Sequence, residues 1–339
     1  MRAAYIEELG AADVIRYGEI PAPRPGPTDV RVNVLATAVN PVDTFVRSGL
    51  FPTPVAFPFV VGRDLVGTVA EAGPGVTGFR VGDRVWCNSL GHGGRQGAAA
   101  EQAVVAADRL YHLPEGVDPY EAVAAVHPAA TAYLALFVHG RLGVGETVLV
   151  AGAAGSVGSA LVTMAVRAGA RVLATAGARD AEYCAELGAA EVFDYRDPEL
   201  TQHIRGAAPA GIGLYLDTAG VNDLETTVEL LALRGRVVLL AGIGTRPVLP
   251  ARALYMYDRS VVGFVISHAT PGELAAAAAY INDLFGQGAL RPRSIEAFPL
   301  SAAAEVHARL ERGGLRGRRA VLRTACTEPG GEGAATRRE

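Results

Sequence analysis

A glycine-rich loop between an apolar strand and a helix is the feature that most limits how this chain can fold. The apolar run over 147–150 is followed by Ala-Gly-Ala-Ala-Gly-Ser-Val-Gly at 151–158. Beyond the loop, Val157, Leu161, Met164 and Ala168 recur on one helical face. Backbone N–H groups at the start of such a helix can hold a pyrophosphate. The pattern therefore predicts a strand–loop–helix unit that binds a nucleotide.

Each glycine of this loop has a predicted role. Gly152 permits the tight turn, Gly155 lets the backbone approach the phosphates, and Gly158 lets helix and strand pack closely. The spacing G-x-x-G-x-x-G is not the commonest dinucleotide-binding pattern. The prediction of nucleotide binding therefore depends on the position of the loop between two predicted strands. A plain strand-to-helix turn is the alternative interpretation.

The rest of the chain shows two different sequence patterns, one before residue 126 and one after it. Residues 1–125 alternate short apolar runs with Gly, Pro and Asp turns, which indicates a compact, partly antiparallel body such as a barrel. From 126 onward strands alternate with helical segments, which predicts a parallel, doubly wound sheet. Its predicted strands cover 147–151, 171–175, 191–194, 214–217, 236–240 and 261–266. Helices are expected over 271–285 and near 302–312, with a last strand near 319–322.

Composition excludes several classes of protein. A net charge of −4 gives no electrostatic hold on nucleic acid or on an anionic membrane. The 31 basic side chains are all Arg, which excludes a Lys Schiff base or a Lys general base. Cys87, Cys184 and Cys326 are far apart, so no disulfide framework is predicted. We found no signal core and no apolar run of 18 residues, and we expect a cytoplasmic protein with a disordered tail over 324–339.

The end of the second predicted strand indicates which dinucleotide binds. An NAD site places Asp or Glu about 20 residues beyond the loop, where it bonds the ribose hydroxyls. Here the strand 171–175 runs into Ala176-Gly177-Ala178-Arg179, and Asp180 is expected inside the following helix. A small strand end followed by Arg179 offers room and charge for a 2′-phosphate, which favours NADPH over NADH. A solvated surface arginine is the alternative interpretation of Arg179.

Several motifs in a fixed order carry a family resemblance. Residues 2–323 resemble the quinone oxidoreductase (zeta-crystallin-like) branch of the medium-chain dehydrogenase/reductase superfamily. The match rests on Asn-Pro-Val-Asp-Thr-Phe-Val-Arg-Ser-Gly at 40–49, Gly-Arg-Asp-Leu-Val-Gly at 62–67, Gly-Asp-Arg-Val at 82–85, Ala-Thr-Ala-Tyr at 130–133, the glycine-rich loop, and Glu-Val-Phe-Asp-Tyr-Arg at 191–196.

The resemblance implies a fold and a set of cofactor contacts. It implies a GroES-like, partly open β-barrel catalytic domain from 1–125 and 267–323, and a Rossmann domain over 126–266. Arg318 or Arg319 stands where relatives often place a cofactor-contacting Lys, and we assign Arg319. The implied cofactor-binding residues are Asn40, Thr131, Gly152, Ala153, Gly155, Ser156, Val157, Gly158, Gly177, Arg179, Tyr195, Thr218, Ala241, Gly242, Phe264, Val265, Ile266 and Arg319.

Departures from the zinc-dependent relatives predict that no metal is bound. Those enzymes use a Cys where this chain has Asn40, and a His-Glu pair where it has Arg63-Asp64. Arg63 cannot ligate zinc. The segment 88–105, where relatives hold a structural zinc through four Cys, contains no Cys.

Asn40 and Thr131 are the candidate catalytic residues, with a turn residue and a helix hydroxyl as the alternative readings. Phe45, Phe51, His92 and Tyr257 are expected to line the substrate pocket, although aromatic core and a solvated loop His are alternatives. Close relatives often have Tyr in place of Phe45, so its hydroxyl is missing here.

The predicted function is NADPH-dependent hydride transfer to a quinone or an activated C=C bond of an enone, without zinc. Two alternatives stay open: an enoyl-thioester or polyketide-type enoyl reductase, and a non-catalytic NADPH-binding protein. The apolar strand 261–266 is expected at the sheet edge, where it invites pairing into a homodimer, as relatives do.

Overall fold

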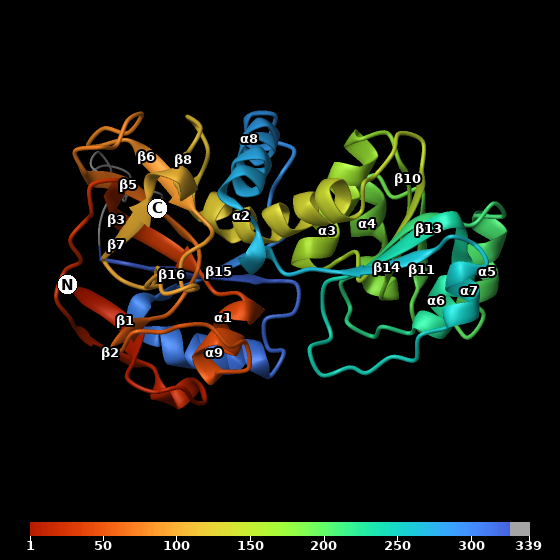
Figure 1. Ribbon diagram of the computed structural model, residues 1–339, viewed down its shortest axis with the longest axis horizontal. Helices are drawn as coiled ribbons and strands as arrows, with labels where there is room; N and C mark the ends of the chain where they lie inside the picture. Colours follow the sequence, from red (N-terminus) through yellow and green to blue (C-terminus); the bar gives the residue numbers. More distant parts are fainter. Residues whose placement is uncertain (326–339) are drawn as a thin grey trace, which may run out of the picture. The chain divides into compact units, whose positions relative to one another are not determined.

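The computed structural model describes residues 1–325, which form two compact units (Figure 1). Unit 1 comprises residues 1–124 and the chain from 294 onward, and unit 2 comprises 125–293. Residues 267–293 therefore fall in unit 2, whereas the sequence predicted them in the catalytic domain. The reason is helix α8 (Pro271–Gly286), whose Tyr280 packs against Tyr133 and Phe137 of unit 2, with ring centroids 5.5 and 5.6 Å apart.

The predicted tail over 324–339 overlaps the described residues only at its start. Residues 326–339 lie outside the described residues. Thr324 continues along the preceding strand, and its backbone N–H donates to the carbonyl of Leu35 (3.1 Å).

Unit 1 is built on two sheets. The smaller has the order β2-β1-β4, and the larger the order β15-β16-β3-β5-β6-β8, with β7 beside β3. Val30, Val32 and Val34 alternate along β3 and are fully buried with Leu65 and Val85. The strands are β1 (Arg2–Ile6), β2 (Arg16–Glu19), β3 (Asp29–Ala38), β4 (Phe59–Val60), β5 (Leu65–Ala72), β6 (Arg84–Cys87), β7 (Gln102–Ala106), β8 (Tyr111–His112), β15 (Ile295–Pro299) and β16 (Arg319–Arg323).

The late chain completes unit 1, because β16 pairs with β3. Helix α9 (Ala303–Glu311) packs against α1 (Pro41–Ser48) and the short turn η1 (Ala12–Val14). The sequence did not predict α1. It begins where the Asn40 N–H donates to the Asp43 carboxylate (2.7 Å) and ends at Gly49, whose φ of 79° suits glycine. Two more single turns are η2 (Ala107–Arg109) and η6 (Leu300–Ala302).

Unit 2 contains one parallel sheet of six strands in the order β11-β10-β9-β12-β13-β14. In chain order this is 3-2-1-4-5-6, the doubly wound arrangement whose switch point lies between β9 and β12. The predicted α/β fold class is confirmed. The strands are β9 (Thr147–Ala151), β10 (Arg171–Ala176), β11 (Glu191–Asp194), β12 (Ile212–Asp217), β13 (Leu231–Leu239) and β14 (Ser260–Gly263).

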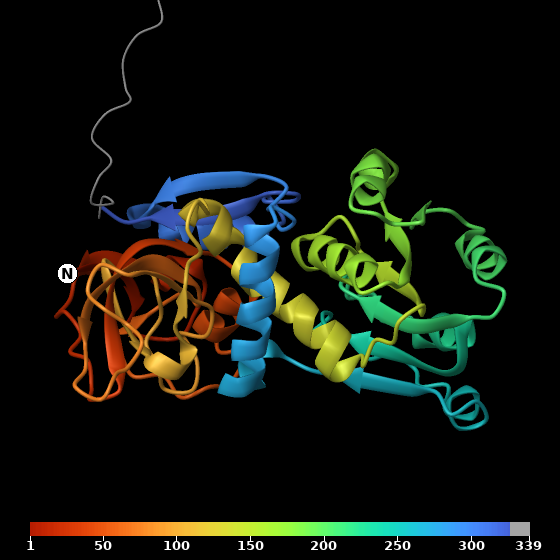
Figure 2. The same ribbon diagram turned by 90° about the horizontal axis from the view of Figure 1, so that it is seen from above.

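Strand β14 takes the predicted edge position but ends at Gly263, three residues early. Ile266 already begins the turn η5 (Ile266–His268). Helix α3 (Ser156–Arg167) packs against β9 and β10 (Figure 2). The other helices are η4 (Ala178–Asp180), α4 (Ala181–Glu186), α5 (Leu200–Ala207), α6 (Leu224–Leu230) and α7 (Ala251–Tyr255).

Helix α2 (Pro119–Tyr133) continues into the π-helix η3 (Leu134–His139). Together they are long and apolar enough to span a membrane, but 72% of that window is buried by the rest of the protein. Such burial is typical of a core helix.

Candidate functional site

The glycine-rich loop leaves the carboxyl end of β9 at the switch point of the sheet. Gly152 has a φ of 77°, and a Cβ there would lie 2.7 Å from the hydroxyl oxygen of Thr218. A Cβ on Gly158 would overlap the carbonyl oxygen of Gly152. Both positions therefore require glycine, one for its backbone angle and one for close packing.

The part of the loop next to α3 is open. Gly155 and Ser156 are exposed, and a Cβ on Gly155 would meet only the Gly152 carbonyl oxygen, at 3.2 Å. The N–H groups of Ser156, Val157 and Gly158 occupy the first turn of α3, which has no preceding turn to supply acceptors. Ala153 is buried and its N–H donates to the Thr175 carbonyl (3.0 Å), which ties the loop to β10. The helix start can thus present N–H donors to an anion.

A buried carboxylate organises the loop after β12. Asp217, which is 4% exposed, accepts N–H bonds from Ala219 (2.8 Å), Gly220 (2.7 Å) and Asn222 (2.8 Å). The hydroxyl of Thr218 donates to the Ala151 carbonyl (2.6 Å). Thr218 was predicted as a site residue and Asp217 was not, although an Asp that ends an apolar strand before Thr-Ala-Gly is a recognisable signal.

The loop after β13 fits against the loop after β12. A Cβ on Gly220 would lie 2.7 Å from the backbone nitrogen of Gly242, which itself has a φ of 87°. The amide of Asn222 donates to the Ala241 carbonyl (3.1 Å) and to the Thr245 hydroxyl (2.6 Å). The structure therefore brings Thr218, Ala241 and Gly242 together near the glycine-rich loop.

A second, exposed group of residues lies at the ends of β10 and β11. A Cβ on Gly177 would lie 3.7 Å from the Tyr195 ring. Tyr195 is 55% exposed, and its hydroxyl accepts from Arg196 (2.8 Å). The side chain of Arg179 is 80% exposed. Sequence analysis quoted Arg196 in a motif but did not place it among the cofactor contacts.

Asp180 follows the end of β10, and its carboxylate is paired with arginine. One carboxylate oxygen accepts from Arg293 (2.8 Å) and the other lies 3.5 Å from Nε of Arg179. The hydrogen bond from Arg293 is the main cause that lowers the pKa of Asp180 below its usual range. The carboxylate therefore stays ionised and paired.

In unit 1, Asn40 lies inside a buried polar network. Its amide nitrogen donates to Asp64 (2.7 Å), and its amide oxygen accepts from Arg319 (2.7 Å). Arg319 is 9% exposed and also donates to the Ala124 carbonyl (2.8 Å). Burial lowers the pKa of Arg319, while the charges of Asp64 and Asp43 oppose that effect. Asn40 and Arg319 were predicted as cofactor contacts. In the structure, the hydrogen bonds of both side chains are made within unit 1.

Beside this network lies Arg63, which is 1% exposed and whose pKa is lowered by burial. Asn40, Arg63 and Asp64 therefore stand at the three positions where the resemblance places a Cys and a His-Glu pair in zinc-dependent relatives. Within residues 1–325, no group of three or more His, Cys, Asp and Glu side chains is placed to hold a metal ion.

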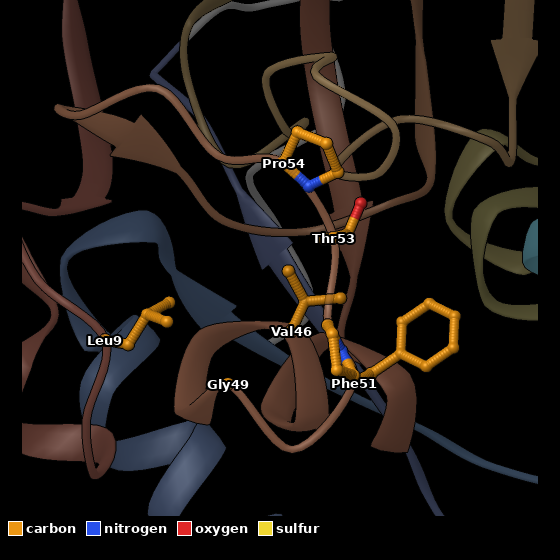
Figure 3. A pocket seen from close by; sticks show the side chains of 7 residues that line it. Leu9, Val46, Gly49, Phe51, Thr53 and Pro54 are labelled. Atoms are coloured by element: carbon orange, nitrogen blue, oxygen red, sulfur yellow. The ribbon is translucent and has the colours of Figure 1, made fainter.

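Two of the four predicted substrate-pocket residues contact each other. The rings of Phe51 and His92 stack with centroids 5.3 Å apart. Phe45 is half-buried, and its carbonyl accepts from the Phe51 N–H (3.0 Å). Tyr257 belongs to unit 2, where the Arg259 guanidinium lies 4.4 Å from its ring centroid. Phe51 alone of the four lines a cavity of about 430 Å³ next to α1 (Figure 3), whose walls are Leu9, Val46, Gly49, Phe51, Pro52, Thr53 and Pro54.

The remaining predicted residues lie on helical or irregular segments of unit 2. The hydroxyl of Thr131 donates to the His127 carbonyl one turn back (3.0 Å). Phe264 stacks on His139 with ring centroids 4.2 Å apart, Val265 is half-buried, and Ile266 is buried.

Comparison with known families and proteins identifies the class. The family described as "Alcohol dehydrogenase GroES-like domain" matches residues 26–115, and the one described as "Zinc-binding dehydrogenase" matches 156–283. A GroES-like unit combined with a Rossmann unit defines a medium-chain dehydrogenase/reductase.

Similar proteins narrow the class to one branch. The chain is 32% identical to quinone oxidoreductase of Rattus norvegicus, over 91% of this chain and 93% of that protein. A mycobacterial quinone oxidoreductase structure matches with a TM-score of 0.82 at 30% identity, covering 95% of this chain and 99% of that one. A mycobacterial protein solved in complex with NADPH matches with a TM-score of 0.82 at 29% identity and the same coverage. The chain therefore belongs to the quinone oxidoreductase branch of the medium-chain dehydrogenase/reductase superfamily.

Proposed function

We propose that this protein is an NADPH-dependent reductase that delivers hydride to a quinone or to the activated C=C bond of an enone, without zinc. The observation that carries the choice of cofactor is the end of β10. There Asp180, the first acid that follows the strand in sequence, is paired with Arg293, while Arg179 and Arg196 present exposed guanidinium groups. The similar mycobacterial protein with bound NADPH supports the same choice.

The described residues fit this cofactor. The exposed Gly155 leaves a cradle that a side chain would fill, beside the N–H groups of Ser156, Val157 and Gly158. These would hold the pyrophosphate, with Gly152 and Ala153 shaping the turn. Gly177, Arg179 and Tyr195 would surround the 2′-phosphate. Thr218, Ala241, Gly242 and the segment 264–266 would line the nicotinamide side.

The cofactor, when bound, supplies the hydride, and the chain's own residues orient the partners and manage the proton. The Thr131 hydroxyl donates a hydrogen bond to the His127 backbone carbonyl, so its oxygen can accept from a ligand hydroxyl. Asp64 and Arg319 fix both ends of the Asn40 amide, so we assign Asn40 a positioning role. Reduction of a quinone takes up a hydride and a proton. Since the chain has no Lys, we assign the proton to solvent or a hydroxyl relay.

Zinc independence is supported by Arg63, whose guanidinium lies beside Asp64 and is not a zinc ligand. We expect the purified protein to contain less than about 0.1 zinc per chain, and treatment with EDTA to leave its NADPH-dependent rate unchanged. A stoichiometric zinc ion whose removal abolishes turnover would contradict this part of the proposal.

We also infer a homodimer that pairs along β14. This strand takes the edge position of the sheet, and edges of this kind favour pairing with another copy. Nearby Tyr255, Met256 and Tyr257 are 70%, 58% and 51% exposed. Light scattering should give twice the mass of one chain, and a monomer mass would remove the inference.

The deciding experiment measures consumption of NADPH with a para-quinone and with a short enoyl thioester, using NADH as the control. Quinone turnover that prefers NADPH supports the proposal. Turnover of the thioester alone would reassign the protein to enoyl reduction. Tight NADPH binding without turnover on either acceptor would support the non-catalytic alternative.

A further inference from the structure

A carboxylate borders the surface that we assign to the 2′-phosphate. A Cβ on Gly177 would lie 3.8 Å from the carboxylate of Asp180 and 3.7 Å from the ring of Tyr195. The acid and the phenol ring therefore flank the same glycine. The side chain of Asp180 is 17% exposed, so part of it faces solvent.

An ionised carboxylate at this position opposes NADPH in two ways. It repels the negative charge of a 2′-phosphate. It also offers an acceptor to the ribose hydroxyls of NADH, which is how acidic residues select NAD in doubly wound sheets. A chain that binds NADPH must therefore neutralise and divert this group.

Arg293 is placed to neutralise the carboxylate and to occupy one of its two oxygens. It reaches Asp180 across 113 residues of sequence with an N–O distance of 2.8 Å. Its guanidinium lies 4.6 Å from the ring centroid of Tyr183, a contact that helps to fix its position. Arg179 approaches Asp180 only at 3.5 Å, and its side chain is 80% exposed. Arg293 is therefore the principal partner, and Arg179 keeps most of its donors available.

We propose that Arg293 is a specificity-determining positioning residue, which holds one oxygen of the Asp180 carboxylate and cancels its charge so that the site accepts a 2′-phosphate. The inference rests on the proposed NADPH-dependent function. Relief by protonation does not replace Arg293 at neutral pH, because an aspartate carboxyl ordinarily ionises about three pH units lower.

The test measures dissociation constants for NADPH and NADH by nucleotide fluorescence in five full-length proteins. These are the wild type, Arg293→Met, Asp180→Asn, the double variant, and Arg205→Met. Arg205 pairs with Glu229 (3.2 Å) on α5 and α6, so its variant removes another surface ion pair of unit 2. Thermal unfolding of each variant checks that it is folded.

We expect Arg293→Met to weaken NADPH binding about tenfold, the order for one uncompensated charge several ångströms from a dianion. Binding of NADH should stay the same or tighten. Asp180→Asn in the same chain should restore NADPH affinity to within about twofold of Asp180→Asn alone. The loss in Arg293→Met should also shrink as ionic strength rises, which a purely structural defect would not do.

Several results would overturn the inference while leaving the proposed cofactor intact. In each of these results the wild type still prefers NADPH. The Arg293→Met variant could bind NADPH as tightly as Arg205→Met does, or it could lose affinity for NADPH and NADH equally. Its NADPH affinity could also stay low when Asp180→Asn is added. A wild type that binds NADH at least as tightly as NADPH would instead overturn the proposed cofactor, and this inference with it.

Discussion

Among the groups of residues that combine carboxylates with arginine, one lies in the interior of unit 1 and another lies at the surface of unit 2. In the interior, Asn40, Asp64 and Arg319 are at most 9% exposed. At the surface, the side chains of Asp180, Arg293 and Arg179 are 17%, 37% and 80% exposed. Removing one partner of a buried pair leaves an uncompensated charge, whereas an exposed pair contributes little to stability. Pairing with arginine is therefore expected to stabilise the folded state in unit 1, whereas in unit 2 we propose that it selects the cofactor.

The strongest test of this contrast is Arg319→Met. The change leaves the Asn40 amide oxygen and the Ala124 carbonyl without their donor, and removes a buried cation near Asp64 and Asp43. We expect the free energy of unfolding in urea to fall by about 3–5 kcal/mol. The matched control is Arg318→Met, because Arg318 is 55% exposed and pairs with Glu296 at 3.2 Å. A loss of less than about 1 kcal/mol in both variants would contradict the contrast.

A substitution in the glycine-rich loop tests the effect of close packing on nucleotide binding without changing any charge. In Gly158→Ala the new Cβ would overlap the Gly152 carbonyl oxygen, so the loop must shift. We expect a loss of about 3 kcal/mol in stability, together with weaker binding of both nucleotides. In Gly155→Ala the new Cβ would lie 3.2 Å from the same carbonyl oxygen, so the loop has to shift by only a few tenths of an ångström, and the loss of stability should stay below about 1 kcal/mol. Equal losses in the two variants would show that the close approach at Gly158 is not what the loop needs.

Acid destabilises unit 1 without mutation, because the unfolded chain takes up a proton that the buried His307 refuses. Burial, reinforced by the charge of Arg47, lowers the pKa of His307 to about 3. The unfolded chain then binds the extra proton between about pH 3 and 6.5, so stability is full above pH 6.5 and falls as the pH drops through that window. His307 alone should cost about 2 kcal/mol at pH 5.

The measurement is the free energy of unfolding between pH 7 and 5 in the wild type and in His307→Gln. Carboxylates held at lowered pKa, such as Glu146 and Asp180, lose their contribution only below about pH 4.5, outside this range. The variant should show a flatter profile. An unchanged slope would assign the acid sensitivity to other groups.

The smallest effect on stability is expected for Arg179→Ala. Its exposed guanidinium contributes less than about 0.5 kcal/mol to folding, but the proposed phosphate contact should cost about tenfold in NADPH affinity. Urea midpoints and nucleotide titrations measure the two quantities in one protein. If NADH affinity fell equally, the contact would not involve the 2′-phosphate.

Local patterns predicted the parallel sheet well, because each strand of unit 2 is a short apolar run followed by its own helix. They missed α1, whose eight residues begin with Pro41 and are too few to signal a helix alone. They also did not predict the hydrogen-bond partners of Arg319 and Arg293. The partners of these arginines stand 279 and 113 residues away, and only the tertiary fold sets such pairings. The boundary near 267 failed for the same reason, because Tyr280 contacts Tyr133.

The three N–H bonds that converge on Asp217 also bear on the timescale of motion. A loop normally opens far more often than the sheet it leaves, and its amide protons exchange with solvent accordingly. Here the amides of Ala219, Gly220 and Asn222 are fastened to the last residue of a central strand. They should exchange with deuterium as slowly as the sheet itself. We therefore expect the loop 219–222 to be ordered before a ligand binds.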